Sequence, residues 1–167
     1  SYSFSGGYAA NASGIASLAL GSNSNSGSES SSAIGRNSAG GGATTATGAG
    51  AMALGGSYAS GTDSFAAAIA NNTSSYGATG DSSIAIGYQA KAGWQGIAIG
   101  YNAVSIGQQS IAIGYNANVN PSTYVGIAIG TNSAVTGGGA VAISTDTGSG
   151  YGSTASGLYS VALGSSA

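Results

Sequence analysis

The chain has 167 residues, of which 32 are Gly and none is His or Cys. Its formal net charge is −2, and its two basic residues, Arg36 and Lys91, do not make the positive surface that nucleic acid binding requires. Without His or Cys the chain cannot form a Ser-His-Asp triad, a Cys nucleophile or the usual zinc site. We therefore expect no enzyme, no metal site, no cofactor and no nucleic-acid partner.

No apolar run in the sequence is long enough to cross a bilayer. The longest run, 65–70, has six residues, whereas a spanning helix needs about 18 or more. The first residues, 1–4, have neither a basic nor an apolar region of the signal-peptide type. We expect that this chain makes no direct membrane contact, and that any anchor or leader lies in segments absent from it.

A four-residue motif recurs ten times along the chain. It consists of a first residue that is usually apolar, an invariant Ala, an Ile or Leu, and usually a Gly. The copies are 18–21, 32–35, 52–55, 67–70, 84–87, 97–100, 111–114, 127–130, 141–144 and 161–164. A disordered Gly-rich linker has no reason to keep such columns, so the chain is a repeat protein and 1–167 form one repeat domain.

A second Gly divides most repeats into two halves. It precedes the fourth motif position by seven residues in seven of nine cases, by eight in one and by nine in one. The other half of the repeat varies more in length and carries long insertions around 36–48 and 145–157. Insertions confined to one half of a repeat are typical of loops on one face of a solenoid.

The motif alternates large and small side chains with a period of two, which indicates a β-strand. Two Gly-marked breaks in each repeat then predict two short strands joined by turns. The predicted fold is an all-β parallel β-roll or β-solenoid of about ten coils, each of 13–20 residues. A coil this short has a narrow lumen, which we expect the invariant Ala column to fill: Ala19, Ala33, Ala53, Ala68, Ala85, Ala98, Ala112, Ala128, Ala142 and Ala162.

If Ala faces the lumen, the large residues on either side of it must point out of the coil. We expect this apolar surface to be covered by other copies of the chain, because burial of each side chain contributes up to about 1.5–3 kcal/mol. A surface that runs along a rod is best buried around a rotation axis, in a cyclic assembly. The predicted interface residues are Leu18, Leu20, Ile34, Met52, Leu54, Ile69, Ile84, Ile86, Ile97, Ile99, Ile111, Ile113, Ile127, Ile129, Val141, Ile143, Val161 and Leu163.

The repeat from Gly100 to Gly114, Gly-x-Asn-Ala-x-x-x-Gly-x-x-Ser-Ile-Ala-Ile-Gly, resembles the head repeat of YadA-like trimeric autotransporter adhesins. The resemblance implies a left-handed parallel β-roll, with three rolls side by side in a homotrimer. It also implies an extracellular adhesive head on a bacterial surface, held to the outer membrane by segments absent from this chain. Its partners would then be other copies of itself and a host extracellular-matrix protein or glycan, in multivalent attachment to matrix, surfaces or other cells.

Collagen-binding heads of this family carry Asn-Ser-Val-Ala-Ile-Gly, and no copy here has the leading Asn. The sequence therefore does not predict collagen binding. Phage and cell-surface fibres also use such repeats, so the alternative is a structural fibre segment with no binding site in this chain.

Tyr88, Tyr101 and Tyr115 follow the motif Gly in three consecutive copies and should stack at one corner of the solenoid. Together with Trp94 they are the candidate surface for a glycan or protein ligand, because Tyr offers a large contact area at low entropic cost. The alternative is that the stacked rings stabilise the turns and cover neighbouring coils. The recurring Asn two residues after the motif Gly is expected to be structural, because Asn tolerates left-handed backbone.

Overall fold

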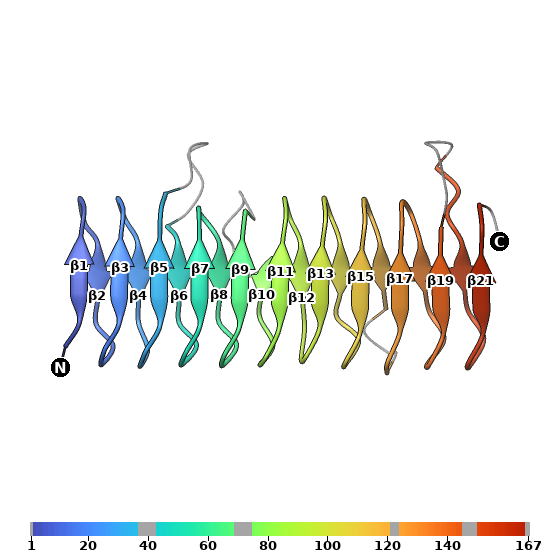
Figure 1. The fold of residues 1–167 in the computed structure, drawn as a ribbon, viewed down its shortest axis with the longest axis horizontal. Coiled ribbons are helices and arrows are strands. Elements are labelled where there is room, and N and C mark those ends of the chain that lie inside the picture. The colour runs from blue at the N-terminus through green and yellow to red at the C-terminus, as the bar shows by residue number, and fades with distance from the viewer. Residues whose placement is uncertain (1, 37–42, 69–74, 121–123, 145–149, 166–167) are drawn as a thin grey trace.

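The computed structural model describes residues 2–36, 43–68, 75–120, 124–144 and 150–165. The chain winds into a rod of flattened coils, and each coil adds one strand to each of two parallel sheets (Figure 1). The described residues contain no helix, and so none that could cross a membrane. The predicted all-β parallel solenoid is confirmed.

The two sheets differ in the length of their strands. The eleven-stranded sheet is built from three-residue strands: β1 (Phe4–Gly6), β3 (Leu18–Leu20), β5 (Ser32–Ile34), β7 (Met52–Leu54), β9 (Phe65–Ala67), β11 (Ile84–Ile86), β13 (Ile97–Ile99), β15 (Ile111–Ile113), β17 (Ile127–Ile129), β19 (Val141–Ile143) and β21 (Val161–Leu163). The ten-stranded sheet is built from two-residue strands: β2 (Asn11–Ala12), β4 (Asn25–Ser26), β6 (Thr45–Ala46), β8 (Tyr58–Ala59), β10 (Gly77–Ala78), β12 (Lys91–Ala92), β14 (Val104–Ser105), β16 (Asn118–Val119), β18 (Ala134–Val135) and β20 (Thr154–Ala155).

Two turns complete each coil and lie along opposite edges of the rod. The first turn leads from an odd-numbered strand to the next even-numbered strand, and the second turn leads back to the following odd-numbered strand (Figure 1). Parallel strands one coil apart are spaced by about 4.8 Å. Equivalent residues of successive coils therefore stack in columns along the rod.

The space between the two sheets holds only small side chains. The middle residue of almost every strand in the eleven-stranded sheet is a fully buried Ala: Ala19, Ala33, Ala53, Ala66, Ala85, Ala98, Ala112, Ala128 and Ala142. The largest fully buried side chains are those of Val119, Val135 and Thr44. Ala162, in the last strand, is half-buried. The lumen is thus too narrow for the Ile and Leu side chains of the motif.

Buried serines at the end of the second turn satisfy the polar groups of that turn. The hydroxyl groups of Ser17, Ser83 and Ser110 each donate to the carbonyl of the Gly three residues earlier, at 2.5–2.8 Å. No buried side-chain nitrogen or oxygen among the described residues lacks a hydrogen-bond partner. Small size and a short-range hydrogen bond together explain why Ser is common next to the lumen.

For one motif copy the sequence pattern predicts the wrong register. The sequence pattern placed Ala68 in the lumen and Ile69 on the outer face, but β9 runs from Phe65 to Ala67. Ala66 is the buried residue, whereas Ala68 is exposed in the turn with a φ of 56°. Ile69 lies outside the described residues. The error arose because the run 65–70 is apolar throughout, so its alternation could be read in two registers.

The eleventh strand of the larger sheet, β1, was not predicted. In β1, Ser5 stands where the other copies have Ala, and Gly6 stands opposite Leu20. The predicted insertion around 36–48 begins between β5 and β6, and that around 145–157 begins between β19 and β20, so the residues added before β6 and β20 lie at first turns. Residues 37–42 and 145–149 of these insertions lie outside the described residues.

Both turns require left-handed backbone. Fifteen non-Gly residues have positive φ values between 52° and 57°. Asn23, Asn102, Asn116 and Asn132, four of the recurring asparagines, are among them. The structural role expected for these four residues is therefore confirmed, because Asn adopts this conformation at lower cost than most residues.

The motif Gly is required where one coil approaches the next. Gly100 has a φ of 131°, and a Cβ atom added to it would lie 2.4 Å from the carbonyl oxygen of Gly114. Gly164 has a similar φ of 112°, but a Cβ atom there would meet nothing within 4 Å. Both positions therefore need a positive φ, which favours Gly, but only at Gly100 would a side chain also collide with the next coil.

We predict that Gly100→Ala lowers the free energy of unfolding more than Gly164→Ala. Gly164→Ala should cost only dihedral strain, roughly 1–3 kcal/mol, whereas Gly100→Ala must also push two coils apart. Urea denaturation followed by circular dichroism measures both values. Equal losses in the two variants would contradict the close approach of the coils.

Candidate functional site

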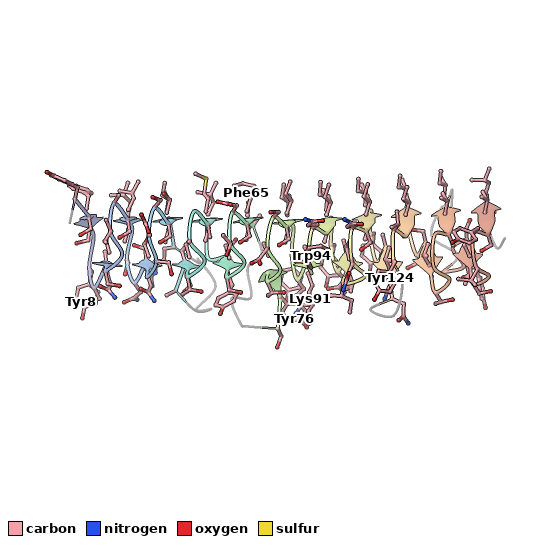
Figure 2. The ribbon with its side chains drawn as sticks, turned by 90° about the horizontal axis from the view of Figure 1, so that it is seen from below. Tyr8, Phe65, Tyr76, Lys91, Trp94 and Tyr124 are labelled. Carbon is pink, nitrogen blue, oxygen red and sulfur yellow. The ribbon has the colours of Figure 1, made fainter. Side chains whose placement is uncertain are left out.

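The outer face of the eleven-stranded sheet is apolar along the rod. We call its outward-pointing side chains the apolar face: they are the first and third residues of each strand from β3 to β21, among them Phe65 and Ala67 in β9, and Ser32 in β5 is the one polar member. Most are half-buried because they pack on their neighbours in the column. Met52, Ile113 and Ile143 are 36–40% exposed, and Val161 and Leu163 in the last strand are 62–65% exposed. Ile69 lies outside the described residues; every other predicted interface residue flanks the inward-facing Ala of its strand and so points out of the coil (Figure 2).

The outer face of the ten-stranded sheet is different in character. In Figure 2, Phe65 marks the apolar face and Lys91 lies on the opposite side of the rod. The outward residues of this polar face are Asn11, Asn25, Thr45, Tyr58, Gly77, Lys91, Val104, Asn118, Ala134 and Thr154. Lys91 is the one charged residue among them. The two faces of the rod thus contrast sharply, and only the apolar face resembles a surface that needs a cover.

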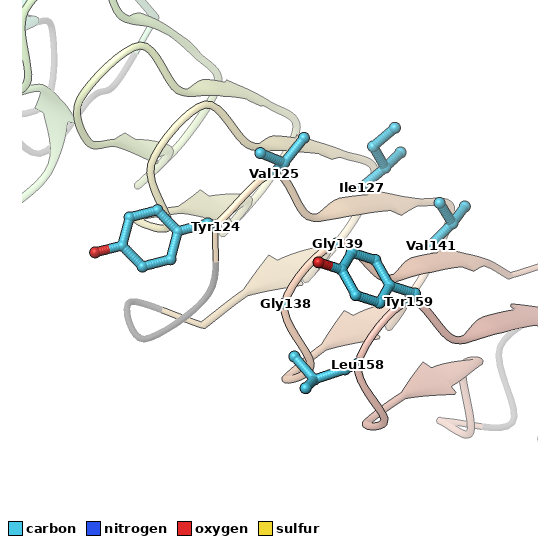
Figure 3. Close-up of a pocket in the computed structure, with 8 residues that line it drawn as sticks. All are labelled: Tyr124, Val125, Ile127, Gly138, Gly139, Val141, Leu158 and Tyr159. Atoms are coloured by element: carbon cyan, nitrogen blue, oxygen red, sulfur yellow. The ribbon is translucent and has the colours of Figure 1, made fainter.

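An apolar groove of about 570 Å³ continues the apolar face around the edge of the rod (Figure 3). Ile127 and Val141 of the apolar face form one side of it, and residues of three second turns form the rest, including the exposed Val125, Leu158 and Tyr159. A Cβ atom on Gly139 would lie 2.6 Å from the Tyr159 ring, so Gly at this turn lets the ring lie close to the backbone.

Three tyrosines stack in a column at the first turns. The ring centroids of Tyr88 and Tyr101 are 5.0 Å apart with an interplanar angle of 12°, and those of Tyr101 and Tyr115 are 5.2 Å apart at 11°. The backbone beneath the rings is tied from coil to coil. The Asn102 amide donates to the Tyr88 carbonyl at 2.8 Å, and the Asn116 amide donates to the Tyr101 carbonyl at 2.9 Å. We call these three residues the tyrosine ladder.

The stacking decides what the tyrosine ladder can offer to a ligand. Each ring lies face to face with its neighbour, so both faces of Tyr101 are used within the ladder. The three residues are nevertheless 41–50% exposed, and because both faces of Tyr101 are covered, its exposure belongs to the ring edge and the hydroxyl group. The ladder therefore suits hydrogen bonding through a row of hydroxyl groups better than stacking of sugar rings.

Trp94 does not join the tyrosine ladder. It lies in a second turn, between β12 and β13, whereas the tyrosines lie in first turns along the opposite edge of the rod. Its carbonyl accepts from the Gln109 amide at 3.1 Å, which places it in the column of second turns. Trp94 is 43% exposed. The four candidate ligand residues thus form two separate surfaces, which the spacing in the sequence did not distinguish.

The acidic residues show no catalytic arrangement in the described part of the chain. Asp81 accepts a hydrogen bond from the Thr62 amide at 2.8 Å and so serves a turn. Within the described ranges no three His, Cys, Asp or Glu residues are grouped so that they could hold a metal ion.

Comparison with known proteins identifies the repeat. The family model of the YadA head domain repeat, which spans two copies, matches residues 7–24, 12–38, 78–93, 95–117 and 146–167, together more than half of the chain. No curated protein matches the sequence.

A solved structure matches almost the whole chain. The crystal structure of the collagen-binding domain of the Yersinia adhesin YadA aligns with 94% of this chain and 72% of its own, at 25% sequence identity and a TM-score of 0.56. The repeat model and this structural match agree on the family and on the fold. The chain belongs to the family of YadA head domains.

Proposed function

We propose that the chain is the adhesive head of a bacterial surface protein and that it works as a side-by-side homotrimer. The observation that carries the proposal is the contrast between the two outer faces. The apolar face runs from β3 to β21, while the opposite face is polar with one charge. Membership of the YadA head family and the match to a YadA head structure support the adhesin assignment.

In the proposed trimer the apolar faces of three rods meet around a common axis. Each subunit then contacts one neighbour on each side, because a cyclic interface joins two different surfaces. The groove beside Ile127 and Val141 is continuous with the apolar face, so the neighbouring subunit is its occupant. The burial of large apolar side chains, worth up to about 1.5–3 kcal/mol each, drives the association.

This arrangement leaves the polar faces and the turns on the outside. Three identical polar faces, almost without charge, suit hydrogen bonding to a matrix protein or a glycan. Weak contacts repeated on three subunits raise the overall affinity without a tight single site. We propose a binding module rather than an enzyme, displayed outside the cell and joined to the outer membrane through other parts of a longer protein.

We predict that the wild-type chain has a solution mass near three chains by light scattering. Replacing both Ile99 and Ile113 by Asp should reduce it to one chain, because two carboxylates per subunit would be buried at the axis. The matched control is Val104→Asp with Asn118→Asp, which adds charge to the polar face of β14 and β16. The control should remain a trimer.

A stable wild-type monomer would contradict the proposed assembly. Masses that grow with concentration and do not stop at three chains would instead favour a structural fibre segment, since unpaired strands at the ends of a solenoid can template further pairing.

We predict that the trimer attaches to surfaces coated with matrix protein or glycan far more strongly than the Ile99→Asp, Ile113→Asp monomer does. The expected loss is on the order of 10²–10⁴-fold, because the monomer keeps the single site and loses avidity. Binding to fibrillar collagen, a glycan array and cells displaying the same chain separates the ligand classes. Equal binding by monomer and trimer would exclude multivalent attachment.

The same binding assays test whether the tyrosine ladder contacts the ligand. Phe at positions 88, 101 and 115 keeps the stacked rings and removes the hydroxyl row, so it should weaken attachment while the trimer persists. Trp94→Phe tests the opposite edge separately. If neither variant changes binding, the contact lies elsewhere, and the stacked rings serve the stability of the turns.

A further inference from the structure

We propose that the tyrosine ladder is an oxidative cross-linking site, at which Tyr101 forms a dityrosine bond with Tyr88 or Tyr115. The ring centroids of both pairs lie 5.0–5.2 Å apart. Such a bond would join two successive coils of one chain covalently. The proposal does not depend on adhesion, and it concerns a modification of the described residues themselves.

The chemistry requires a one-electron oxidant, for which we name hydrogen peroxide acting through a haem peroxidase. Each phenol loses one electron and one proton to give a phenoxyl radical, whose unpaired spin is partly on the Cε carbons. A Cε–Cε bond then forms between two rings, and each Cε proton moves to the ring oxygen to restore the phenol. Overall, two tyrosines and one hydrogen peroxide give one dityrosine and two water molecules.

The structure supplies the proximity that this coupling needs. A phenoxyl radical is short-lived, so the second ring must already be beside it, and a fixed neighbour acts at a very high effective concentration. The backbone hydrogen bonds from Asn102 to Tyr88 and from Asn116 to Tyr101 hold the rings one coil apart. The side chains themselves are 41–50% exposed and can turn their Cε atoms toward each other.

Solvent exposure and ring stacking also favour this site over the other tyrosines. Tyr101 is 45% exposed, so it can be oxidised from solution. The remaining seven tyrosines all lie within the described residues, and none of them stacks on another aromatic ring. The chain has no Cys. A dityrosine bond would therefore give this rod a covalent link between coils that disulfides do not provide.

The experiment treats the whole chain with a peroxidase and a limiting amount of hydrogen peroxide. Dityrosine is detected by its blue fluorescence and by mass spectrometry of peptides that have lost two hydrogen atoms. We expect cross-linked peptides that join Tyr101 to Tyr88 or to Tyr115. On a denaturing gel the product should run as a single chain, because the bond lies within one subunit.

Two matched variants test the assignment. Tyr101→Phe keeps the stacked ring but cannot form a phenoxyl radical, and it leaves Tyr88 and Tyr115 two coils apart, about 10 Å. Tyr124→Phe removes an exposed tyrosine that has no stacked partner. We expect Tyr101→Phe to abolish the fluorescence and Tyr124→Phe to leave it unchanged. Undiminished fluorescence in Tyr101→Phe, or cross-links that map to other tyrosines, would overturn the proposal.

Discussion

The narrow space between the two sheets determines the rest of this structure. Each coil has only one two-residue and one three-residue strand, so the sheets lie too close for anything larger than Ala, Ser, Thr or an occasional Val. Close packing leaves no room for rearrangement inside such a coil. Large apolar side chains must therefore point outward, even though they are the residues that usually form a core.

A fold of this kind places its apolar surface on the outside of the rod, and in the proposed trimer other copies of the chain bury it. The Ala column provides a regular but thin interior, and the outward Ile, Leu and Val residues supply most of the apolar area available for further burial. The same strands then serve both the stability of the coil and the proposed assembly, because each contributes Ala to the lumen and large apolar side chains to the proposed axis. In the proposed trimer the polar face and the turns remain accessible to a ligand, and insertions and aromatic residues there change little of the interior.

The repeat columns predicted the fold well because each column corresponds to a physical position. Ala at the lumen, Gly at the turns and Asn in left-handed backbone are all predicted by the pattern, whereas the close approach of two coils at the motif Gly is seen only in the structure. The prediction at Ala68 was wrong because 65–70 is apolar throughout. The usual spacing places the fourth motif position seven residues after Gly61, at position 68, and this register gives the observed strand Phe65–Ala67. The first strand was missed since Ser5 replaces Ala. Trp94 is separated from the tyrosine ladder because it occupies a second turn and the tyrosines occupy first turns. Closeness in the sequence alone does not distinguish the two kinds of turn.

The central claim is that the apolar face is the inside of an assembly. The chain has no Cys, so one cysteine can be placed in β13 as Ile99→Cys and, separately, one in β14 of the same coil as Val104→Cys. Cross-linking each variant with a short bismaleimide and running a denaturing gel compares the two faces directly. The account predicts covalent dimers from Ile99→Cys and none from Val104→Cys. Dimers from Val104→Cys alone, or the same yield from both, would contradict it.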